Sequence, residues 1–210
     1  MTIISHRHRF VFIAVPKSAS HSIRFAVRDQ LGPQDEEQVA LFVRRRIERP
    51  EFAAVGHGHQ LAREVRAALG VTVWEQYCSF AVIRNPWERF VSYAAFMMRF
   101  NGLFVQDPLG TLRWMLANPD QQSPPHFRSQ SDYLTDDAGQ LIVQHLCRAE
   151  TLQADFAAVC AMTGLAPRVL EVRNPSEHRH YTEYYDAALA QAVGEHYRED
   201  VERFGYRFGD

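Results

Sequence analysis

The stretch Val11–Ser22, with the sequence VFIAVPKSASHS, decides the fold of this chain. Its first residues continue a run of β-formers that begins at Phe10, and Pro16 ends that run. A helix-like pattern of apolar residues then begins at Ile23. A buried strand that turns tightly into a helix directs backbone N–H groups out of the turn, beside the positive end of the helix dipole. Because Lys17 adds a cation at the rim, this turn predicts a cradle for a phosphate or sulfate group.

This turn differs from the phosphate-binding loop of ATP and GTP hydrolases. That loop has the pattern GxxxxGK[ST], whereas Lys17 precedes the small residues of the turn instead of following them. The order argues against an ordinary nucleotide hydrolase. A plain strand–helix turn with an exposed lysine is the other interpretation, and this segment alone does not decide between them.

Length and composition fit an ordinary globular domain. A chain of 210 residues with 46% apolar residues suits a single domain, and its net charge of −2 provides no bulk attraction to nucleic acid or to anionic membranes. The three cysteines are widely spaced and form no CxxC pair, which argues against a disulfide framework and predicts inert buried thiols at Cys78 and Cys147. No signal peptide or apolar run of about 18 residues is visible, so we expect a cytoplasmic protein without a transmembrane segment.

Predicted strands and helices alternate along the chain. This alternation predicts an α/β fold with a P-loop-like, mostly parallel β-sheet flanked by helices, and with ligands outside the carboxyl ends of the strands. A polar loop is expected over 121–133, and a short strand over 170–172. The predicted main strands are 10–15, 77–83 and 141–147, and the predicted helices are 20–30, 35–48, 61–69, 86–100, 109–117, 152–163 and 186–204.

A second unusual segment begins at Arg84, directly after the predicted strand 77–83. Asn85 can cap a helix whose first residue is Pro86, and Ser92 lies two helical turns beyond Arg84. A guanidinium at a strand end is suited to forked hydrogen bonds with a second phosphate. A salt bridge of Arg84 and a merely tolerated mid-helix serine form the alternative interpretation.

Together the two segments resemble the sulfotransferases, and most closely sulfotransferase family 2. The resemblance rests on the loop Lys17-Ser18-Ala19-Ser20-His21-Ser22 and on the segment Arg84-Asn85-Pro86-Trp87-Glu88-Arg89 with Ser92. It extends to QSDYL at 130–134, RAETL at 148–152 and the C-terminal segment 181–208. It implies a single sulfotransferase-like, three-layer domain over 1–210. In that family the first loop grips the 5′-phosphosulfate of 3′-phosphoadenylyl sulfate (PAPS), and the arginine and serine of the second segment hold its 3′-phosphate.

A third segment, GHGH at 56–59, also follows a short apolar run, so all three unusual segments are expected at one edge of the sheet. In an extended segment His57 and His59 point to the same side, where they could be polar loop residues, two ligands of a zinc site or a general base. The uronyl 2-O-sulfotransferases of heparan sulfate carry a similar His-Gly-His. That similarity implies that His59 is the general base and that His57 supports it or contacts the substrate.

The resemblance implies in-line transfer of a sulfuryl group to an acceptor hydroxyl, with adenosine 3′,5′-bisphosphate as product. Lys17 would neutralise the leaving group, and the N–H groups of the loop would hold the 5′-phosphate together with the Ser20 and Ser22 hydroxyls. No metal is expected, because a sulfuryl group carries less charge than a phosphoryl group. Many relatives have glycine where this chain has Ala19 and Ser20, so we expect a loop that uses ordinary dihedral angles or binds the anion less well.

The acceptor is not readable from the sequence. Carbohydrate hydroxyls are the family-level expectation, while lipid, metabolite and peptide hydroxyls remain open. A non-catalytic nucleotide- or sulfated-glycan-binding module and a P-loop-type nucleotide kinase are the competing functions, and the oligomeric state is not predicted.

The substrate-contact candidates are His57, Arg128 and Gln130, with the segment Arg99–Arg128 as an acceptor region. Arg173 and Arg179 are candidates to close over the nucleotide, and Trp87, Phe90 and Met97 are predicted core residues. Arg44–Arg46 are expected to form a solvated helix end, with a contribution to acceptor binding as the alternative.

Overall fold

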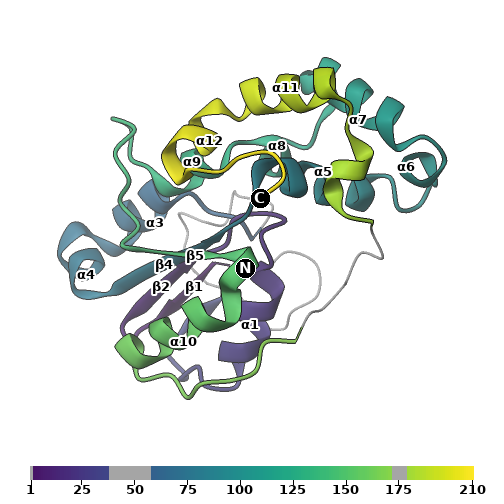
Figure 1. The fold of residues 1–210 in the computed structure, drawn as a ribbon. Coiled ribbons are helices and arrows are strands. Elements are labelled where there is room, and N and C mark those ends of the chain that lie inside the picture. The colour runs from purple at the N-terminus through teal and green to yellow at the C-terminus, as the bar shows by residue number, and fades with distance from the viewer. Residues whose placement is uncertain (1, 38–57, 172–178) are drawn as a thin grey trace. The chain divides into compact units, whose positions relative to one another are not determined.

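A computed structural model describes residues 2–37, 58–171 and 179–210 of the chain (Figure 1). The chain divides into two compact units, and each unit is built from two separate stretches of sequence. Unit 1 comprises Met1–Ile83 and Asp132–Arg173, and unit 2 comprises Arg84–Ser131 and Asn174–Asp210. That both units act as one sulfotransferase-like domain stays a prediction.

Unit 1 contains a sheet of five strands in its described part, in the order β3-β1-β2-β4-β5. β2 pairs in parallel with β4, and β4 with β5, whereas β1 pairs antiparallel with both β2 and β3. The sheet is therefore mixed, and the prediction of a mostly parallel sheet is right for its β2-β4-β5 part only. The strands are β1 (Ile3–Ser5), β2 (Phe10–Ile13), β3 (Glu36–Glu37), β4 (Cys78–Ile83) and β5 (His145–Arg148).

The short strands are those that the sequence analysis missed or misplaced. β1 was not predicted, and β3 lies within the helix predicted over 35–48, whose remaining residues from 38 on fall outside the described part. β5 begins four residues after the start of the predicted strand 141–147, since Leu141 is exposed and makes only an isolated bridge to Thr135. Residues 170–171 form no strand. β3 and β5 pair with strands more than 30 residues away in the sequence, so no local pattern shows them.

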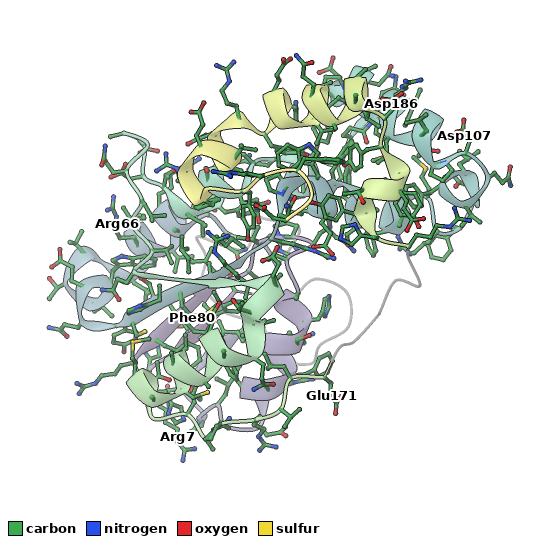
Figure 2. The ribbon with its side chains drawn as sticks, viewed as in Figure 1. Arg7, Arg66, Phe80, Asp107, Glu171 and Asp186 are labelled. Carbon is green, nitrogen blue, oxygen red and sulfur yellow. The ribbon has the colours of Figure 1, made fainter. Side chains whose placement is uncertain are left out.

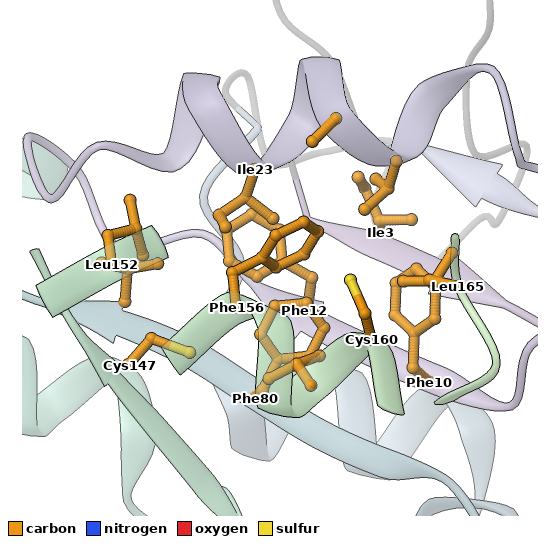
Figure 3. Packing of buried hydrophobic residues seen from close by; sticks show 14 of the residues in the cluster. Ile3, Phe10, Phe12, Ile23, Phe80, Cys147, Leu152, Phe156, Cys160 and Leu165 are labelled. Carbon is orange, nitrogen blue, oxygen red and sulfur yellow. The ribbon is translucent and has the colours of Figure 1, made fainter. Parts of the chain in front are cut away.

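Two helices of unit 1 cover one face of the sheet, α1 (Ser20–Arg28) and α10 (Leu152–Thr163) (Figure 3). Phe10, Phe12 and Phe80 from the sheet pack with Ile23 of α1 and Phe156 of α10, and all five are fully buried or nearly so. Burial of each such side chain contributes about 1.5–3 kcal/mol. α3 (Ala62–Leu69) and α4 (Val71–Gln76) also belong to this unit. The predicted helices 20–30, 61–69 and 152–163 are thus confirmed.

Unit 2 is helical in its described residues. The predicted helix starting at Pro86 is confirmed, with Asn85 as its cap, because the Asn85 side chain accepts a hydrogen bond from the Trp87 N–H at 3.1 Å. The helix predicted over 186–204 is broken at Tyr197, whose φ of −103° and ψ of 30° leave the helical region. The helices are α5 (Pro86–Met97), α6 (Leu103–Gln106), α7 (Pro108–Ala117), η1 (Pro119–Gln121), α8 (Pro124–Phe127), the start of α9 (Gln130–Leu134), η3 (Tyr181–Tyr184), α11 (Ala187–His196) and α12 (Arg198–Phe204).

Two other expectations for unit 2 were wrong. The predicted loop 121–133 contains the short helices α8 and α9. Trp87 and Phe90 are buried as predicted, but Met97 is 38% exposed, because it lies in the last turn of α5. No helix in the described residues of either unit is long and apolar enough to span a lipid bilayer.

Candidate functional site

The turn between β2 and α1 adopts an unusual backbone conformation. Lys17 has a φ of 66° and Ala19 a φ of 62°, whereas Ser18 between them is not in the positive region. Left-handed residues in a tight turn can direct neighbouring backbone N–H groups toward one concave side, which is a feature of anion-binding turns. The expectation that a loop without glycine would use ordinary dihedral angles is therefore wrong. Lys17 and Ala19 adopt the positive φ despite their side chains.

The serine hydroxyls of this turn hold the turn itself. Ser18 and Ser20 both donate to the carbonyl oxygen of Val15, at 2.8 and 2.7 Å. Ser22 donates to the Glu171 carbonyl at 2.9 Å. This corrects the prediction that the Ser20 and Ser22 hydroxyls hold the ligand, because their hydrogens already bond to backbone oxygens. The Ser22 N–H donates to the Ala19 carbonyl at 3.0 Å, so the other backbone N–H groups at the start of α1 remain the candidate donors, since the first residues of a helix have no acceptor four residues before them in the helix.

His21 stands in the first turn of α1 with an exposed side chain. Its pKa is lowered from the ordinary value, first by partial removal of the ring from water and then by the positive charges of Arg24 and Lys17. His21 is therefore more readily neutral than an ordinary histidine. Arg24, Lys17 and the helix dipole all contribute positive potential at this turn.

His59 is placed at the end of β2 by a hydrogen bond. Its Nδ1 lies 2.6 Å from the carbonyl oxygen of Ala14, and the side chain is only 8% exposed. A carbonyl oxygen can only accept, so Nδ1 carries the proton, and in the neutral ring Nε2 holds the lone pair. Gly58, the residue before His59, is held next to the start of β1, because its carbonyl accepts a hydrogen bond from the N–H of Thr2 at 2.9 Å. His57, Arg44–Arg46 and Arg173 lie outside the described residues.

The carboxyl ends of β2 and β4 continue into, or contact, residues from all three unusual segments. β2 and β4 are parallel neighbours, with Ile13 opposite Ala81, so their carboxyl ends share one edge. His59 joins that edge through Ala14, which directly follows β2. Arg84 is the residue that follows β4 in the chain.

In unit 2, Arg84 and Ser92 are associated with one face of α5. The Arg84 guanidinium forms an ion pair with Glu88 at 2.6 Å. Ser92 lies one turn beyond Glu88, and residues four apart share a helix face. The Ser92 hydroxyl is half-buried and has no hydrogen bond to any residue in the described ranges. Arg84 therefore does form the salt bridge of the alternative interpretation. The ion pair also sets the direction in which the guanidinium points.

Gln130 has a different role from the predicted one. Its side chain is 0% exposed, and both ends of its amide bond to the backbone of Arg84, so it does not contact substrate. Arg128 is half-buried, and its carbonyl accepts a hydrogen bond from the buried Arg89. The structure does not support Gln130 as a substrate contact, because its side chain has no exposed surface and its amide is engaged with the backbone of Arg84.

A hollow of about 910 Å³ lies within unit 2, at the end of α5 opposite to Arg84. Its lining includes aromatic and charged side chains, among them Arg179. One of its lining residues, Tyr185, donates through its hydroxyl to the Trp87 carbonyl in the first turn of α5, at 2.9 Å. Other lining residues are Met98, Phe104, Tyr184, and the two acidic residues Asp107 and Asp186, which are labelled in Figure 2.

The part of the chain that the structure describes includes side chains of the types that bind metal ions, and all three cysteines. No group of three or more His, Cys, Asp or Glu side chains there is arranged to hold a metal ion. Cys147 is buried, and burial raises the pKa of its thiol to about 12. Burial also raises the pKa values of Cys78 and Cys160. The prediction of a buried thiol is thus right for Cys147, whereas Cys78 is only half-buried.

Comparison with known proteins decides the family. The profile of the Sulfotransferase family matches residues 1–207, which is nearly the entire chain. The chain belongs to sulfotransferase family 2. The match extends over both units of this sulfotransferase, and it supports sulfotransfer from a sulfate donor to an acceptor in general. No curated protein and no solved structure matches the chain.

Proposed function

We propose that this sulfotransferase moves a sulfuryl group from PAPS to an acceptor hydroxyl, with His59 as the general base. The hydrogen bond between His59 and Ala14 is the observation that supports this proposal most. It holds the imidazole at the end of β2, three residues before Lys17, and it leaves Nε2 as the basic nitrogen. An imidazole fixed in this tautomer beside an anion-binding turn is suited to removing a hydroxyl proton.

The donor would be held at two places. The turn Lys17–Ser22 would bind the 5′-phosphosulfate through backbone N–H groups, which the left-handed conformation of Lys17 and Ala19 supports. Arg84 and Ser92 would bind the 3′-phosphate from one face of α5. Two anion sites select a nucleotide that has two phosphate groups, and this favours PAPS over ATP.

Transfer would follow an in-line path. His59 Nε2 would take the proton of the acceptor hydroxyl as the oxygen forms its bond to sulfur. The bond from sulfur to the 5′-phosphate oxygen breaks at the same time, and adenosine 3′,5′-bisphosphate leaves. Lys17 would neutralise the charge that grows on the leaving oxygen. Positioning and electrostatics of this kind supply most of the catalysis in the related phosphoryl transfers.

The hollow in unit 2 is the proposed contributor to acceptor specificity. Part of its lining, including Met98, Phe104 and Asp107, belongs to or adjoins the segment Arg99–Arg128, in which the sequence analysis expected acceptor contacts. Aromatic rings next to carboxylates and an arginine suit a hydroxyl-rich acceptor such as a carbohydrate, since rings stack on apolar faces while charged groups bond hydroxyls. Replacing Phe104 by Ala should raise KM for the acceptor and leave donor affinity unchanged.

Removal of the base tests the proposal directly. His59→Ala should lower turnover by about 10² to 10⁴ while calorimetric binding of adenosine 3′,5′-bisphosphate is retained. His8→Ala is the matched control, because His8 also bonds carbonyl oxygens in unit 1, at 3.3 and 3.2 Å, but at the far end of β2 from the turn. It should change stability and not turnover. Equal turnover of His59→Ala and the parent would remove His59 from the mechanism.

Donor binding separates the competing functions. Lys17→Ala and Arg84→Ala should both weaken binding of adenosine 3′,5′-bisphosphate, whereas Arg203→Ala, at an ion pair on α12, should not. Binding without transfer of label from PAPS to any acceptor in a broad screen would favour the non-catalytic module. Transfer of phosphate from ATP in the same screen would favour the kinase.

A further inference from the structure

Gln130 clamps the backbone of Arg84 from both sides. The Arg84 N–H donates to Gln130 Oε1 at 2.9 Å, and Gln130 Nε2 donates to the Arg84 carbonyl at 2.8 Å. A side-chain amide thus pairs with the peptide groups of Arg84 as a neighbouring strand would. Because the backbone of Arg84 is fixed on both sides, the point from which its guanidinium extends is fixed as well.

Gln130 is in turn held by a buried carboxylate. Asp200 on α12 is 0% exposed, and its two oxygens accept hydrogen bonds from the N–H groups of Gln130 and Ser131, at 2.8 and 2.7 Å. A buried carboxylate that accepts two backbone N–H bonds is held in one orientation, since a buried carboxylate without partners is strongly unfavourable. Asp200 therefore determines where the backbone of Gln130 lies.

The residues around this clamp are tied to the same C-terminal part of unit 2. Asn85, the next residue after Arg84, donates through Nδ2 to the Arg207 carbonyl at 3.0 Å and to the Tyr181 hydroxyl at 3.2 Å. Tyr197 donates to the Phe127 carbonyl at 3.0 Å, just upstream of Gln130. The turn that carries Arg84 thus depends on contacts more than 40 residues away in the sequence.

We propose that Gln130 and Asp200 are positioning residues for Arg84, and that they set the discrimination for the 3′-phosphate of the donor. This inference rests on the proposed function, in which Arg84 binds that phosphate. The guanidinium is directed by Glu88 at its tip and by Gln130 at its backbone. Loss of the backbone clamp lets Arg84 shift, so that its forked hydrogen bonds to the phosphate lose their alignment.

The test measures a ratio of two affinities by calorimetry. The Kd of adenosine 5′-monophosphate divided by that of adenosine 3′,5′-bisphosphate isolates the contribution of the 3′-phosphate. The decrease of this ratio in Arg84→Ala is the reference against which the other variants are compared. Gln130→Leu, which removes both hydrogen bonds, should lower the ratio about tenfold, and it should add little in the Arg84→Ala background. Asp200→Asn should lower it in the same direction by a smaller factor.

Gln122→Leu is the matched control for a merely structural role. Gln122 is also buried in unit 2 and also makes two hydrogen bonds with its amide, to Tyr93 and Asn118, but it does not touch Arg84. It should lower Tm and leave the ratio unchanged. A ratio in Gln130→Leu equal to that of the parent, with the Arg84→Ala reference showing its loss, overturns the positioning role.

Gln130→Glu gives a second readout, and it serves if Gln130→Leu does not fold. A protonated carboxyl group has one donor and one acceptor, as the amide has, whereas an ionised one would face the Arg84 carbonyl with no donor. Relative to the parent at each pH, the ratio of this variant should recover as the pH is lowered from about 8 to about 5. A ratio that stays low or stays normal throughout contradicts the clamp.

The clamp can also be followed without any nucleotide. Hydrogen exchange at the Arg84 N–H should be at least tenfold faster in Gln130→Leu than in Gln122→Leu, because only the former removes its acceptor. If this exchange responds while Arg84→Ala leaves the affinity ratio unchanged, the clamp exists but Arg84 does not read the 3′-phosphate. That result rejects the donor assignment and, with it, the role in discrimination.

Discussion

Two residues of the anion-binding turn Lys17–Ser22 adopt a backbone conformation that residues with a side chain usually avoid. Lys17 and Ala19 have φ values of 66° and 62°, which cost residues with a Cβ about 1–2 kcal/mol each. The serine hydroxyls that bond to Val15 keep the turn in this form. The molecule therefore tolerates strain at the position where backbone N–H groups must converge, as binding sites often do.

Replacement of Ala19 by Gly should relieve part of this strain. We expect Ala19→Gly to raise the free energy of unfolding by up to about 1 kcal/mol, measured by urea denaturation, because the relief exceeds the entropy that glycine adds to the unfolded chain. Ala26→Gly, in the middle of α1, should instead lower it by about 1 kcal/mol. Equal losses in both variants would show that the φ of Ala19 carries no strain.

The titration of His21 reports the charge of the turn. Its pKa, followed by NMR, should lie below the ordinary value in the free protein and rise when adenosine 3′,5′-bisphosphate binds, because a nearby anion favours the charged ring. Lys17→Ala should raise the pKa in the free protein, since the Lys17 charge is one of the causes that lower it. A pKa that does not move on binding would place the phosphate elsewhere.

Among the elements, single polar side chains decide how strands and helices begin. Asp35 joins the turn after β1 to the segment before β3. One of its carboxylate oxygens accepts hydrogen bonds from the Ser5 hydroxyl at 2.6 Å and the Gly32 N–H at 2.8 Å, and the other accepts one from the Arg7 N–H at 3.0 Å. Asn85 likewise connects the start of α5 to the C-terminal residues. Both contacts span sequence distances that no local pattern shows.

Asp35→Asn should destabilise the protein at neutral pH by about 1–3 kcal/mol. Burial alone would raise the pKa of Asp35, but hydrogen bonds from Ser5, Arg7 and Gly32 outweigh burial and lower it. The carboxylate's stabilising effect is thus fully present above the pKa of the unfolded chain and is lost as the pH falls through the lower folded value. The variant should therefore lose less stability in acid than the parent. Asp29→Asn, at an exposed position, is the control and should change stability by no more than about 0.5 kcal/mol.

Asn85→Ala should cost more than an ordinary cap. Its loss removes the acceptor for Trp87 N–H and also the two donor contacts to Tyr181 and Arg207, so we expect about 2–3 kcal/mol from thermal unfolding. Asp107→Ala removes a cap with one bond, to the Gly110 N–H, and should cost about 1 kcal/mol. Similar losses in the two variants would mean that the contacts to the C-terminal residues contribute nothing.

For the whole molecule, the notable property is that each compact unit takes residues from two parts of the chain. The chain passes from unit 1 to unit 2 at Arg84, directly after β4, and returns at Asp132. The candidate base and the anion turn belong to unit 1, whereas Arg84 and Ser92 belong to unit 2. The proposed function therefore draws its donor contacts from residues of both units.

Hydrogen exchange can test this sharing. Adenosine 3′,5′-bisphosphate should slow exchange both in the turn at Lys17–Ser22 and at the start of α5, because one ligand would hold both. At a fixed, limiting nucleotide concentration, Lys17→Ala or Arg84→Ala should reduce the protection in both places together. Protection that is lost only in the unit that carries the substitution would indicate two independent anion sites.

The sequence predicted those features that depend on neighbouring residues. The long elements were found because periodicity, Pro86 after a capping Asn85, and Gly70 after α3 act over a few residues. The anion turn was also found, since a strand, a lysine and small residues follow one another directly. The conformation of the turn was not, because the hydrogen bonds of its serines to Val15 are needed to hold Lys17 and Ala19 at positive φ.

What the sequence by itself determined is the family, the order of the principal elements and the types of residue available for binding and proton transfer. Only the tertiary structure decided which nitrogen of His59 holds the proton, that Gln130 supports Arg84 instead of contacting substrate, and that Asp200 supports Gln130. The physical reason is range. Local rules depend on residues within about four positions, whereas these hydrogen bonds join residues 45, 46 and 70 positions apart and exist only once the chain is folded.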